Sequence, residues 1–238
     1  HVVRGSDHVT NTATQIQMIE ALGGAVPSFA HHSLLTGPQG ESLSKRLGTL
    51  ALRDLREQGV EPEALISLMA RLGSSQPVEL RMSLEEVADG FSLDQFGSAP
   101  TKFDVQDLFP LTARKLHALE YASVKDELAE LGVPDEQADA FWSVARANIT
   151  TRKDIAAWWA LCRDGAEALI ADEDADFIAE AMALLPDGPL SQDSWGAWTN
   201  AVKEATGRKG KGLFMPLRKA VTGQERGPEM ADLLPLLQ

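Results

Sequence analysis

The chain opens with His1-Val2-Val3-Arg4-Gly5-Ser6-Asp7-His8, which together with the residues up to 36 indicates the fold of its first part. Its paired valines are typical of the end of a buried strand. Asn11 or Thr12 can cap a helix that Gly23-Gly24 ends. That helix places three apolar residues on one face: Ile16, Ile19 and Leu22. A second strand can follow over residues 28–35, and strand, helix and strand in this order predict an α/β piece.

From about residue 50 onward the strand signals fade and helical signals take over. Pro62 suits the first turn of a helical segment that Gly73 ends, and Ser83-Leu84-Glu85-Glu86 has the spacing of a capping box. Further helices are expected over six stretches: 124–131, 135–148, 152–164, 173–185, 193–206 and 228–237. The expected fold class is therefore mainly α, with a partial α/β piece at the front.

The composition indicates a folded protein, since 44% of the 238 residues are hydrophobic and 24% are charged. A net charge of −13 argues against a general affinity for nucleic acid or anionic membranes, although a local basic patch is compatible with it. No apolar run approaches the length of a membrane span, and no charged-then-apolar leader opens the chain. These features favour a soluble cytoplasmic protein with no membrane partner. Because the chain begins without Met, in what reads as a strand end, we expect a fragment of a longer chain.

Cys162 is the single cysteine, which excludes a disulfide framework and any multi-cysteine metal site. It follows Trp158-Trp159-Ala160-Leu161 in a helical pattern, so we expect a buried thiol. His31-His32 would place adjacent side chains on opposite faces of an extended segment, and we expect no bound metal or prosthetic group. Three other tryptophans are expected in the core rather than stacked on bases: Trp142, Trp195 and Trp198.

Two polar segments have a functional and a plain structural interpretation. Arg4, Asp7 and His8 follow the expected strand end, where α/β sheets bind ligands, but they also suit an ordinary strand-to-helix loop. Lys45 and Arg46 lie in a glycine-flanked loop that can carry a cation over the phosphates of a nucleotide, or can be a solvated basic turn.

The C-terminal stretch, residues 200–238, is basic although the chain as a whole is acidic. Its basic residues are Lys203, Arg208, Lys209, Lys211, Arg218, Lys219 and Arg226. Its acidic residues are Glu204, Glu225, Glu229 and Asp232. Seven against four gives a net charge of +3, which leaves −16 on the rest of the chain. A basic end on an acidic body suits a phosphate backbone, and a solvated helix face is the alternative.

A series of motifs then runs in order along the whole chain. They are the stretch 1–12, Gln15, Ala21-Leu22-Gly23, Phe29-Ala30-His31 with Leu34-Leu35, Leu43-Ser44-Lys45-Arg46, Pro62-Glu63-Ala64-Leu65 with Leu72-Gly73, Phe103-Asp104, Gly207-Arg208-Lys209-Gly210-Lys211, Pro216-Leu217-Arg218 and Thr222-Gly223. Taken together, they resemble the bacterial glutamyl-tRNA synthetases, a family of class I aminoacyl-tRNA synthetases.

The resemblance implies four regions. Residues 1–36 would be the second half of a Rossmann-type catalytic domain, and residues 37–121 a stem-contact domain that carries the family's signature loop. Residues 122–186 and 187–238 would be two helical anticodon-binding subdomains. The family's N-terminal His-Ile-Gly-His-type signature and its acceptor-binding insertion have no counterpart in the chain, so we expect the chain alone to be catalytically inactive.

The resemblance also implies roles in binding the small substrates. Arg4 would hold the glutamate carboxylate, a two-point contact suited to a guanidinium group, and His8 would line the amino-acid pocket. Asp7 would accept hydrogen bonds from the ribose hydroxyls of ATP. Leu34 and Leu35 would frame the adenine, with backbone groups reading its edge.

The signature loop would contact ATP through five residues: Ser42, Leu43, Ser44, Lys45 and Arg46. Lys45 would be the catalytic residue, stabilising the α-phosphate and the departing pyrophosphate as glutamyl-adenylate forms. The family pattern is Lys-hydrophobic-Ser-Lys-Arg, and Ser42 stands where its first Lys belongs. One phosphate contact is therefore lost or is supplied elsewhere. ATP with Mg²⁺ would be a substrate rather than a resident cofactor.

The same resemblance, together with the basic charge of residues 200–238, implies that seven residues contact tRNA. They are Asn148, Arg208, Lys209, Lys211, Arg218, Gly227 and Pro228. Asn148 stands where discriminating members carry an Arg that reads the third anticodon base. We therefore expect glutamate tRNA as partner, with relaxed specificity towards glutamine tRNA. The alternative is that Asn148 is an exposed helix end and that Arg146 or Arg152 reads the base.

The expected function is that of a glutamate–tRNA ligase, which activates L-glutamate with ATP and transfers it to the 3′ end of tRNA, acting as a monomer. The alternative is a tRNA-anticodon-binding module without catalytic activity, against which the loop of Lys45 argues. A related enzyme that glutamylates a modified tRNA base lacks helical anticodon domains, so residues 122–238 argue against it. A helical scaffold without a ligand would be separated from these by titration with ATP and tRNA.

Overall fold

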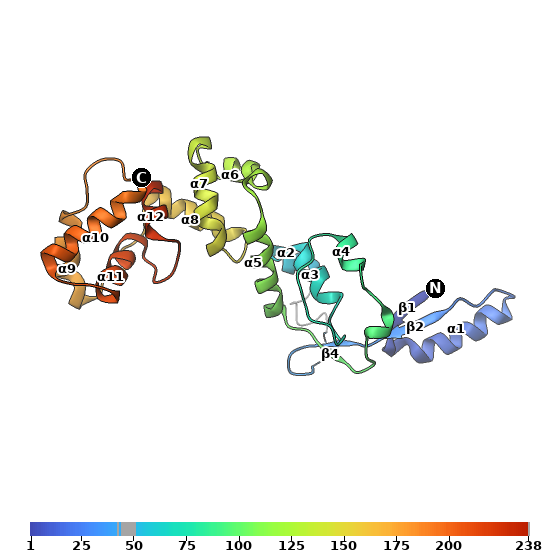
Figure 1. Ribbon diagram of the computed structural model, residues 1–238. Coiled ribbons are helices and arrows are strands. Elements are labelled where there is room, and N and C mark those ends of the chain that lie inside the picture. The colour runs from blue at the N-terminus through green and yellow to red at the C-terminus, as the bar shows by residue number, and fades with distance from the viewer. Residues whose placement is uncertain (42, 44–50, 238) are drawn as a thin grey trace. The chain divides into compact units, whose positions relative to one another are not determined.

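The computed structural model describes residues 1–41, 43 and 51–237 (Figure 1). These residues form two compact units, 1–115 and 116–238. The predicted contacts of Ser42, Ser44, Lys45 and Arg46 lie outside the described residues. The expected class, mainly α with an α/β piece at the front, is confirmed.

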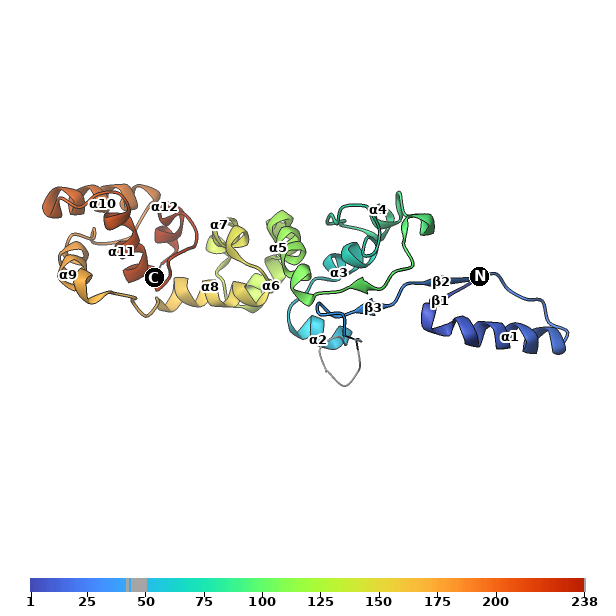
Figure 2. The ribbon, with the colours of Figure 1, turned by 90° about the horizontal axis from the view of Figure 1, so that it is seen from below.

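The chain opens with a parallel strand pair joined by a helix. β1 (Val2–Gly5) pairs with β2 (Phe29–His32), with Val2 opposite Phe29 and Arg4 opposite His31. Parallel neighbours need a crossover connection, and α1 (Val9–Ala21) provides it (Figures 1 and 2). The expected strand–helix–strand order is therefore correct.

Two details of this opening segment differ from expectation. The helix begins at Val9, so neither Asn11 nor Thr12 caps it. Thr12 instead lies inside α1, where its hydroxyl donates to the carbonyl of His8. The expected second strand over residues 28–35 is divided, because β2 ends at His32 and β3 (Leu35–Thr36) pairs in parallel with the distant β4 (Thr101–Lys102).

The rest of the first unit is built from short helices around one apolar cluster. They are α2 (Leu52–Glu57), α3 (Pro62–Met69), α4 (Leu84–Ala88) and the start of α5 (Leu108–Ala118). Their buried core is Leu55, Ala64, Leu68, Phe103, Leu108 and Leu111. Lys115 forms ion pairs with both Glu61 and Glu63, which ties α5 to the first turn of α3.

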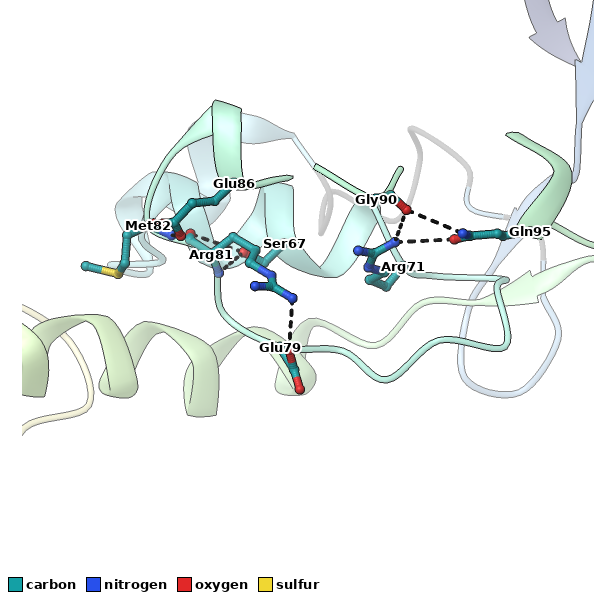
Figure 3. Close-up of polar contacts among 8 residues, drawn as sticks. All are labelled: Ser67, Arg71, Glu79, Arg81, Met82, Glu86, Gly90 and Gln95. Atoms are coloured by element: carbon teal, nitrogen blue, oxygen red, sulfur yellow. Dashed lines mark hydrogen bonds and ion pairs between the residues drawn. The ribbon is translucent and has the colours of Figure 1, made fainter. Parts of the chain in front are cut away.

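The predicted capping box at Ser83 is only half formed. The Ser83 hydroxyl accepts from the backbone N–H of Glu86 at 3.2 Å, as expected. The Glu86 carboxylate, however, accepts from the N–H of Met82 at 2.8 Å rather than from that of the cap residue (Figure 3). The reciprocal bond of the box is thus displaced by one residue.

The second unit is helical. Its elements are α6 (Lys125–Glu130), α7 (Asp135–Ala145), α8 (Lys153–Asp164), α9 (Ala175–Ala183), α10 (Gln192–Thr206), α11 (Lys211–Thr222) and α12 (Met230–Leu233). All six expected helices are present, the last as α12 followed by a 3₁₀ turn. We did not expect α11, because Gly212 and Pro216 both lower helical propensity.

Two apolar clusters fill the second unit. One combines α6, α7 and α8 with residues 230–236 and includes Trp142, Phe141 and Leu128. The other lies between α9, α10 and α11 and includes Trp198 and Leu213. The C-terminal residues therefore pack on helices that precede them by a long stretch of chain. No helix among the described residues is long and apolar enough to cross a lipid bilayer.

Candidate functional site

The carboxyl end of β1 gathers four polar side chains. Arg4 donates from Nη1 to the side-chain oxygen of Gln15 at 2.6 Å, and its Nη2 lies 2.8 Å from Nδ1 of His8. A guanidinium group has only donors, so His8 accepts at Nδ1 and carries its proton on Nε2. That Nε2 lies 3.8 Å from a carboxylate oxygen of Asp7. Arg4, Asp7 and His8, which the sequence analysis singled out, thus lie together, and Gln15 joins them from α1.

Behind this group, Thr12 and His31 link α1 to β2. The Thr12 hydroxyl uses its proton towards the carbonyl of His8, at 3.0 Å. Nε2 of His31 lies 2.9 Å from the same hydroxyl oxygen and therefore donates to it. Thr12 is buried, so this link is shielded from water. It fixes α1 on the sheet and with it the positions of His8 and Gln15.

His32 lies apart from His31, as the alternation along a strand predicts. Its Nδ1 bonds to the carbonyl of Ser33 at 2.7 Å, whereas His31 contacts Thr12. Within the part of the chain that the structure describes, no group of three or more His, Cys, Asp or Glu side chains is arranged to hold a metal ion.

Leu34 and Leu35, which we expected to frame adenine, lie where β2 passes into β3. The carbonyl of Leu34 accepts from the N–H of Thr101 at 2.9 Å, and its side chain is 39% exposed. Leu35 is half-buried and packs against the core of the first unit. The remaining described residue of the signature loop, Leu43, packs against the same core.

A cavity of about 340 Å³ lies in the first unit beside β2 and was not foreseen from the sequence. Its walls are mainly apolar and include Val3, His31, Leu35, Met69, Phe91 and Phe96. Arg71 secures one wall, because it donates to the carbonyl of Gly90 at 3.5 Å and to the side chain of Gln95 at 3.4 Å (Figure 3). The signal in the sequence is weak, since Phe91 and Phe96 stand in a glycine-rich stretch without periodicity.

Four of the residues expected to contact tRNA meet around Trp158 in the second unit. The indole N–H donates to the backbone carbonyl of Asn148 at 3.3 Å. A Cβ atom added at Gly227 would lie 2.8 Å from Trp158 and 3.4 Å from the Arg218 guanidinium, so only glycine fits there. Arg218 donates from Nη2 to the carbonyl of Pro228 at 2.8 Å. Its Nη1 is buried without a hydrogen-bond partner among the described residues.

The Asn148 side chain is itself engaged at the end of its helix. Its amide nitrogen donates to the carbonyl of Val144 at 3.1 Å, and the residue is half-buried. Of the two alternatives named for this position, Arg146 donates to the carbonyl of Leu119 at 3.3 Å, and Arg152 forms an ion pair with Glu127. Both arginines are therefore held by partners inside the chain.

The remaining three predicted tRNA contacts lie after the end of α10, and the last of them, Lys211, is the first residue of α11. Arg208 is paired with Asp174, whereas Lys209 and Lys211 are exposed. Lys219, another member of the basic end, lies 2.6 Å from Glu225, and this cation lowers the pKa of the Glu225 carboxyl. Part of the basic charge of residues 200–238 is thus neutralised within the fold.

The residues that we expected in the core are there. Cys162 is buried, and loss of hydration raises the pKa of its thiol to about 12, so it is no nucleophile at neutral pH. Trp142 and Trp198 are buried and donate to the carbonyls of Leu119 and Ala181, at 3.0 and 2.7 Å. Trp195 is partly buried and packs against both clusters of the second unit.

Comparison with known proteins identifies a family for each of the two parts of the chain. Residues 1–110 match the family described as tRNA synthetases class I (E and Q), catalytic domain. Residues 122–238 match the anticodon binding domain. The chain is 75% identical to glutamate–tRNA ligase 1 of Ruegeria pomeroyi and 72% identical to glutamate–tRNA ligase 2 of another Ruegeria strain. All of the chain is matched in both cases, but it spans only 54% of the length of these relatives.

The fold is also similar to that of solved structures. A glutamate tRNA ligase from Elizabethkingia meningosepticum, crystallised in complex with its amino acid, superposes with a TM-score of 0.75 at 26% identity. The match covers 100% of this chain and 54% of that one. The chain therefore belongs to the bacterial glutamate–tRNA ligases, a family of class I aminoacyl-tRNA synthetases, and contains sequence from both their catalytic and their anticodon-binding domains.

Proposed function

We propose that the protein acts as a glutamate–tRNA ligase, which activates L-glutamate with ATP and Mg²⁺ and then transfers it to the 3′ end of tRNA in the cytoplasm. The observation that carries the proposal is the cluster of Arg4, Asp7, His8 and Gln15 at the carboxyl end of β1. Ligands of α/β sheets bind at this edge, and the cluster offers both charge and donors there.

Arg4 is the residue in this cluster suited to hold the glutamate carboxylate. Its guanidinium donates to Gln15 and His8, which orient it while leaving N–H groups for a substrate. The guanidinium group is planar and always charged, and it binds a carboxylate through two parallel hydrogen bonds.

Asp7 and the signature loop are assigned to ATP. Asp7 is an exposed acceptor next to His8 and suits the ribose hydroxyls. Lys45 would stabilise the negative charge that develops on the α-phosphate and on the departing pyrophosphate. Leu34 and Leu35, where β2 passes into β3, would border the adenine. Ser42 stands where the family has a lysine, and we assign the phosphate contact of that lysine to no other residue.

The second unit is assigned to the anticodon arm of tRNA. Asn148, Gly227, Pro228 and Arg218 surround Trp158, and the buried Nη1 of Arg218 is a donor that a base or phosphate oxygen could complete. One N–H of the Asn148 side-chain amide is used by Val144, so the second N–H and the side-chain oxygen remain available. An acceptor at this position suits the N–H groups of guanine, which supports acceptance of glutamine tRNA beside glutamate tRNA.

Binding of tRNA by the 238-residue chain tests the second part of the proposal. We expect glutamate tRNA to bind with an affinity that falls steeply as salt rises, because basic residues displace counterions from phosphates. A tRNA of unrelated anticodon should bind more weakly at every salt concentration. Equal affinity for both tRNAs would contradict anticodon recognition.

The catalytic part is tested by joining the chain to the first half of the Ruegeria pomeroyi relative. We expect this chimera to catalyse glutamate-dependent ATP–pyrophosphate exchange, and we expect Arg4→Ala to abolish most of that activity. A chimera that binds glutamate tRNA but shows no exchange, with the Ruegeria enzyme active in parallel, would favour the alternative function of an anticodon-binding module.

A further inference from the structure

We propose that Arg208 is a positioning residue for tRNA binding, which anchors the loop 207–211 so that Lys209 and Lys211 face the phosphate backbone. The inference rests on the proposed function and adds a role to it. The basic pattern alone assigns Arg208 to a direct phosphate contact. The structure assigns it to the interior of its own unit.

Three partners hold the Arg208 guanidinium. Nη1 forms an ion pair with the carboxylate of Asp174, just before α9. The guanidinium carbon lies 4.0 Å from the ring centroid of Phe177, a buried residue of the second core cluster. A charge stacked on an aromatic face and paired with a carboxylate is held in one orientation. Arg208 is thereby attached to α9, although it lies between α10 and α11.

The third partner explains why the arginine is needed next to α11. Pro216 lies inside this helix and has no N–H group, so the carbonyl of Gly212 lacks its donor from the following turn. Nη1 of Arg208 lies 3.4 Å from that carbonyl oxygen and supplies a donor instead. Arg208, Gly212 and Pro216 therefore act together: the arginine replaces the donor that the proline lacks and so stabilises the start of α11.

The backbone of the loop is otherwise held at its start, where the N–H of Gly207 donates to the carbonyl of Lys203 at 2.9 Å and the N–H of Arg208 donates to the hydroxyl of Thr206 at 3.2 Å. Gly207 and Gly210 both have positive φ angles, +71° and +58°, and neither has a neighbouring atom within 4 Å of an added Cβ. Glycines lose more conformational entropy than other residues when they are ordered. Lys209 and Lys211 are exposed on either side of Gly210. Anchoring Arg208 places these two cations in advance, which lowers the entropy lost when tRNA binds.

Substitution of Asp174 separates positioning from direct contact, because the two roles predict opposite signs. If Arg208 contacts a phosphate, Asp174→Ala frees it and removes a negative charge, so tRNA should bind more tightly. If Arg208 positions the loop, the same substitution releases the anchor and tRNA should bind more weakly despite the more positive protein. Asp176, two residues further along α9, is exposed and gives a matched control for the change in charge.

The experiment measures the affinity of the 238-residue chain for glutamate tRNA as a function of salt. We expect Asp174→Ala and Arg208→Lys each to weaken binding by about five- to twentyfold, since an ion pair and an aromatic stack are lost or impaired. The slope of log affinity against log salt should fall in magnitude by about one to two for Asp174→Ala, as the two lysines lose their phosphates. Asp176→Ala should bind as tightly as the unsubstituted chain or slightly more tightly.

Lys209→Ala with Lys211→Ala provides the coupling test. If Arg208 acts through these lysines, Asp174→Ala added to the double variant should cause no further loss. Circular dichroism checks that each variant is folded, and Asp174→Asn replaces Asp174→Ala if the latter is not. Unchanged or tighter binding by the folded Asp174 variant would overturn the inference and leave the proposed function intact. Failure of the unsubstituted chain to bind tRNA would overturn both.

Discussion

The first 36 residues and the helical second unit are held together by different forces. Among residues 1–36 Thr12 alone is buried, while Val3, Met18 and Leu22 are 51%, 59% and 85% exposed. In the second unit Trp142 and Trp198 are at most 1% exposed. The opening segment is organised by backbone pairing of β1 with β2 and by polar contacts between α1 and the sheet. The second unit is organised by burial of large apolar side chains.

This difference means that ligand binding and catalysis depend on the opening segment, whereas stability depends on the core of the second unit. Side chains of the opening segment remain accessible, so their substitution is expected to change ligand binding or rate with little effect on folding. Side chains at the centre of the second unit touch no solvent, so their substitution is expected to lower stability. The predictions below test that separation.

Trp198→Ala should have the largest effect. The residue is fully buried in the cluster of α9, α10 and α11 and donates to the carbonyl of Ala181. Truncation leaves a cavity and removes the hydrogen bond from the indole, so the free energy of unfolding should fall by about 3–5 kcal/mol. Met18→Ala, on the exposed part of α1, is the matched control and should change it by less than about 0.5 kcal/mol. Urea denaturation followed by circular dichroism measures both, and similar losses would contradict the comparison.

Lys45→Ala should change the rate of chemistry without changing stability. In the chimera with the Ruegeria pomeroyi sequence, adenylate formation should slow by about 10²-fold or more, because one charge contact to the transition state is removed. Glutamate affinity should hardly change. ATP–pyrophosphate exchange measures the rate, and an exchange rate equal to that of the unsubstituted chimera would show that Lys45 has no such role.

Asn148→Arg should change the choice of tRNA. A guanidinium offers only donors, which match the acceptors of cytosine, so preference for glutamate tRNA over glutamine tRNA should rise by about 10- to 100-fold. The chain should remain folded, although the contact with Val144 is lost. Competition binding with the two tRNAs measures the ratio. A strict preference for glutamate tRNA that the substitution leaves unchanged would refute a role for Asn148 in specificity.

Cys162 should show the smallest functional effect. With a pKa near 12, about one thiol in 10⁴ is ionised at pH 8, so a thiol reagent should label the folded chain very slowly and the urea-unfolded chain quickly. The pKa of a thiol in an unfolded chain is lower, so the unfolded state loses its proton first. Stability from this residue is therefore present below about pH 9 and is lost as pH rises towards 12. Rapid labelling of the folded chain would mean that Cys162 is exposed.

Much of the local structure follows from short-range rules that operate within a few residues. Gly23 ends α1 with a φ of +73°, Pro62 occupies the first turn of α3, and Ser83 caps α4. The tryptophan and cysteine spacing correctly predicts buried positions at Trp142, Trp198 and Cys162. The helix at Lys211–Thr222 was missed, because its Gly212 and Pro216 are unfavourable locally and the missing hydrogen bond is compensated by Arg208 from outside the helix.

The strand–helix–strand opening, most of the helical remainder and the polar residues at the end of β1 follow from local sequence patterns, because strand alternation and helix periodicity depend on neighbours along the chain. Three further arrangements depend on contacts between distant segments: Gln15 orients Arg4, Trp158 joins Asn148 to Gly227, and Asp174 and Phe177 hold Arg208. The charge pattern of a sequence does not distinguish an exposed arginine from one that is paired within the fold. Whether a guanidinium faces solvent or a partner depends on packing between distant segments, and that packing is set by burial of apolar surface rather than by local order.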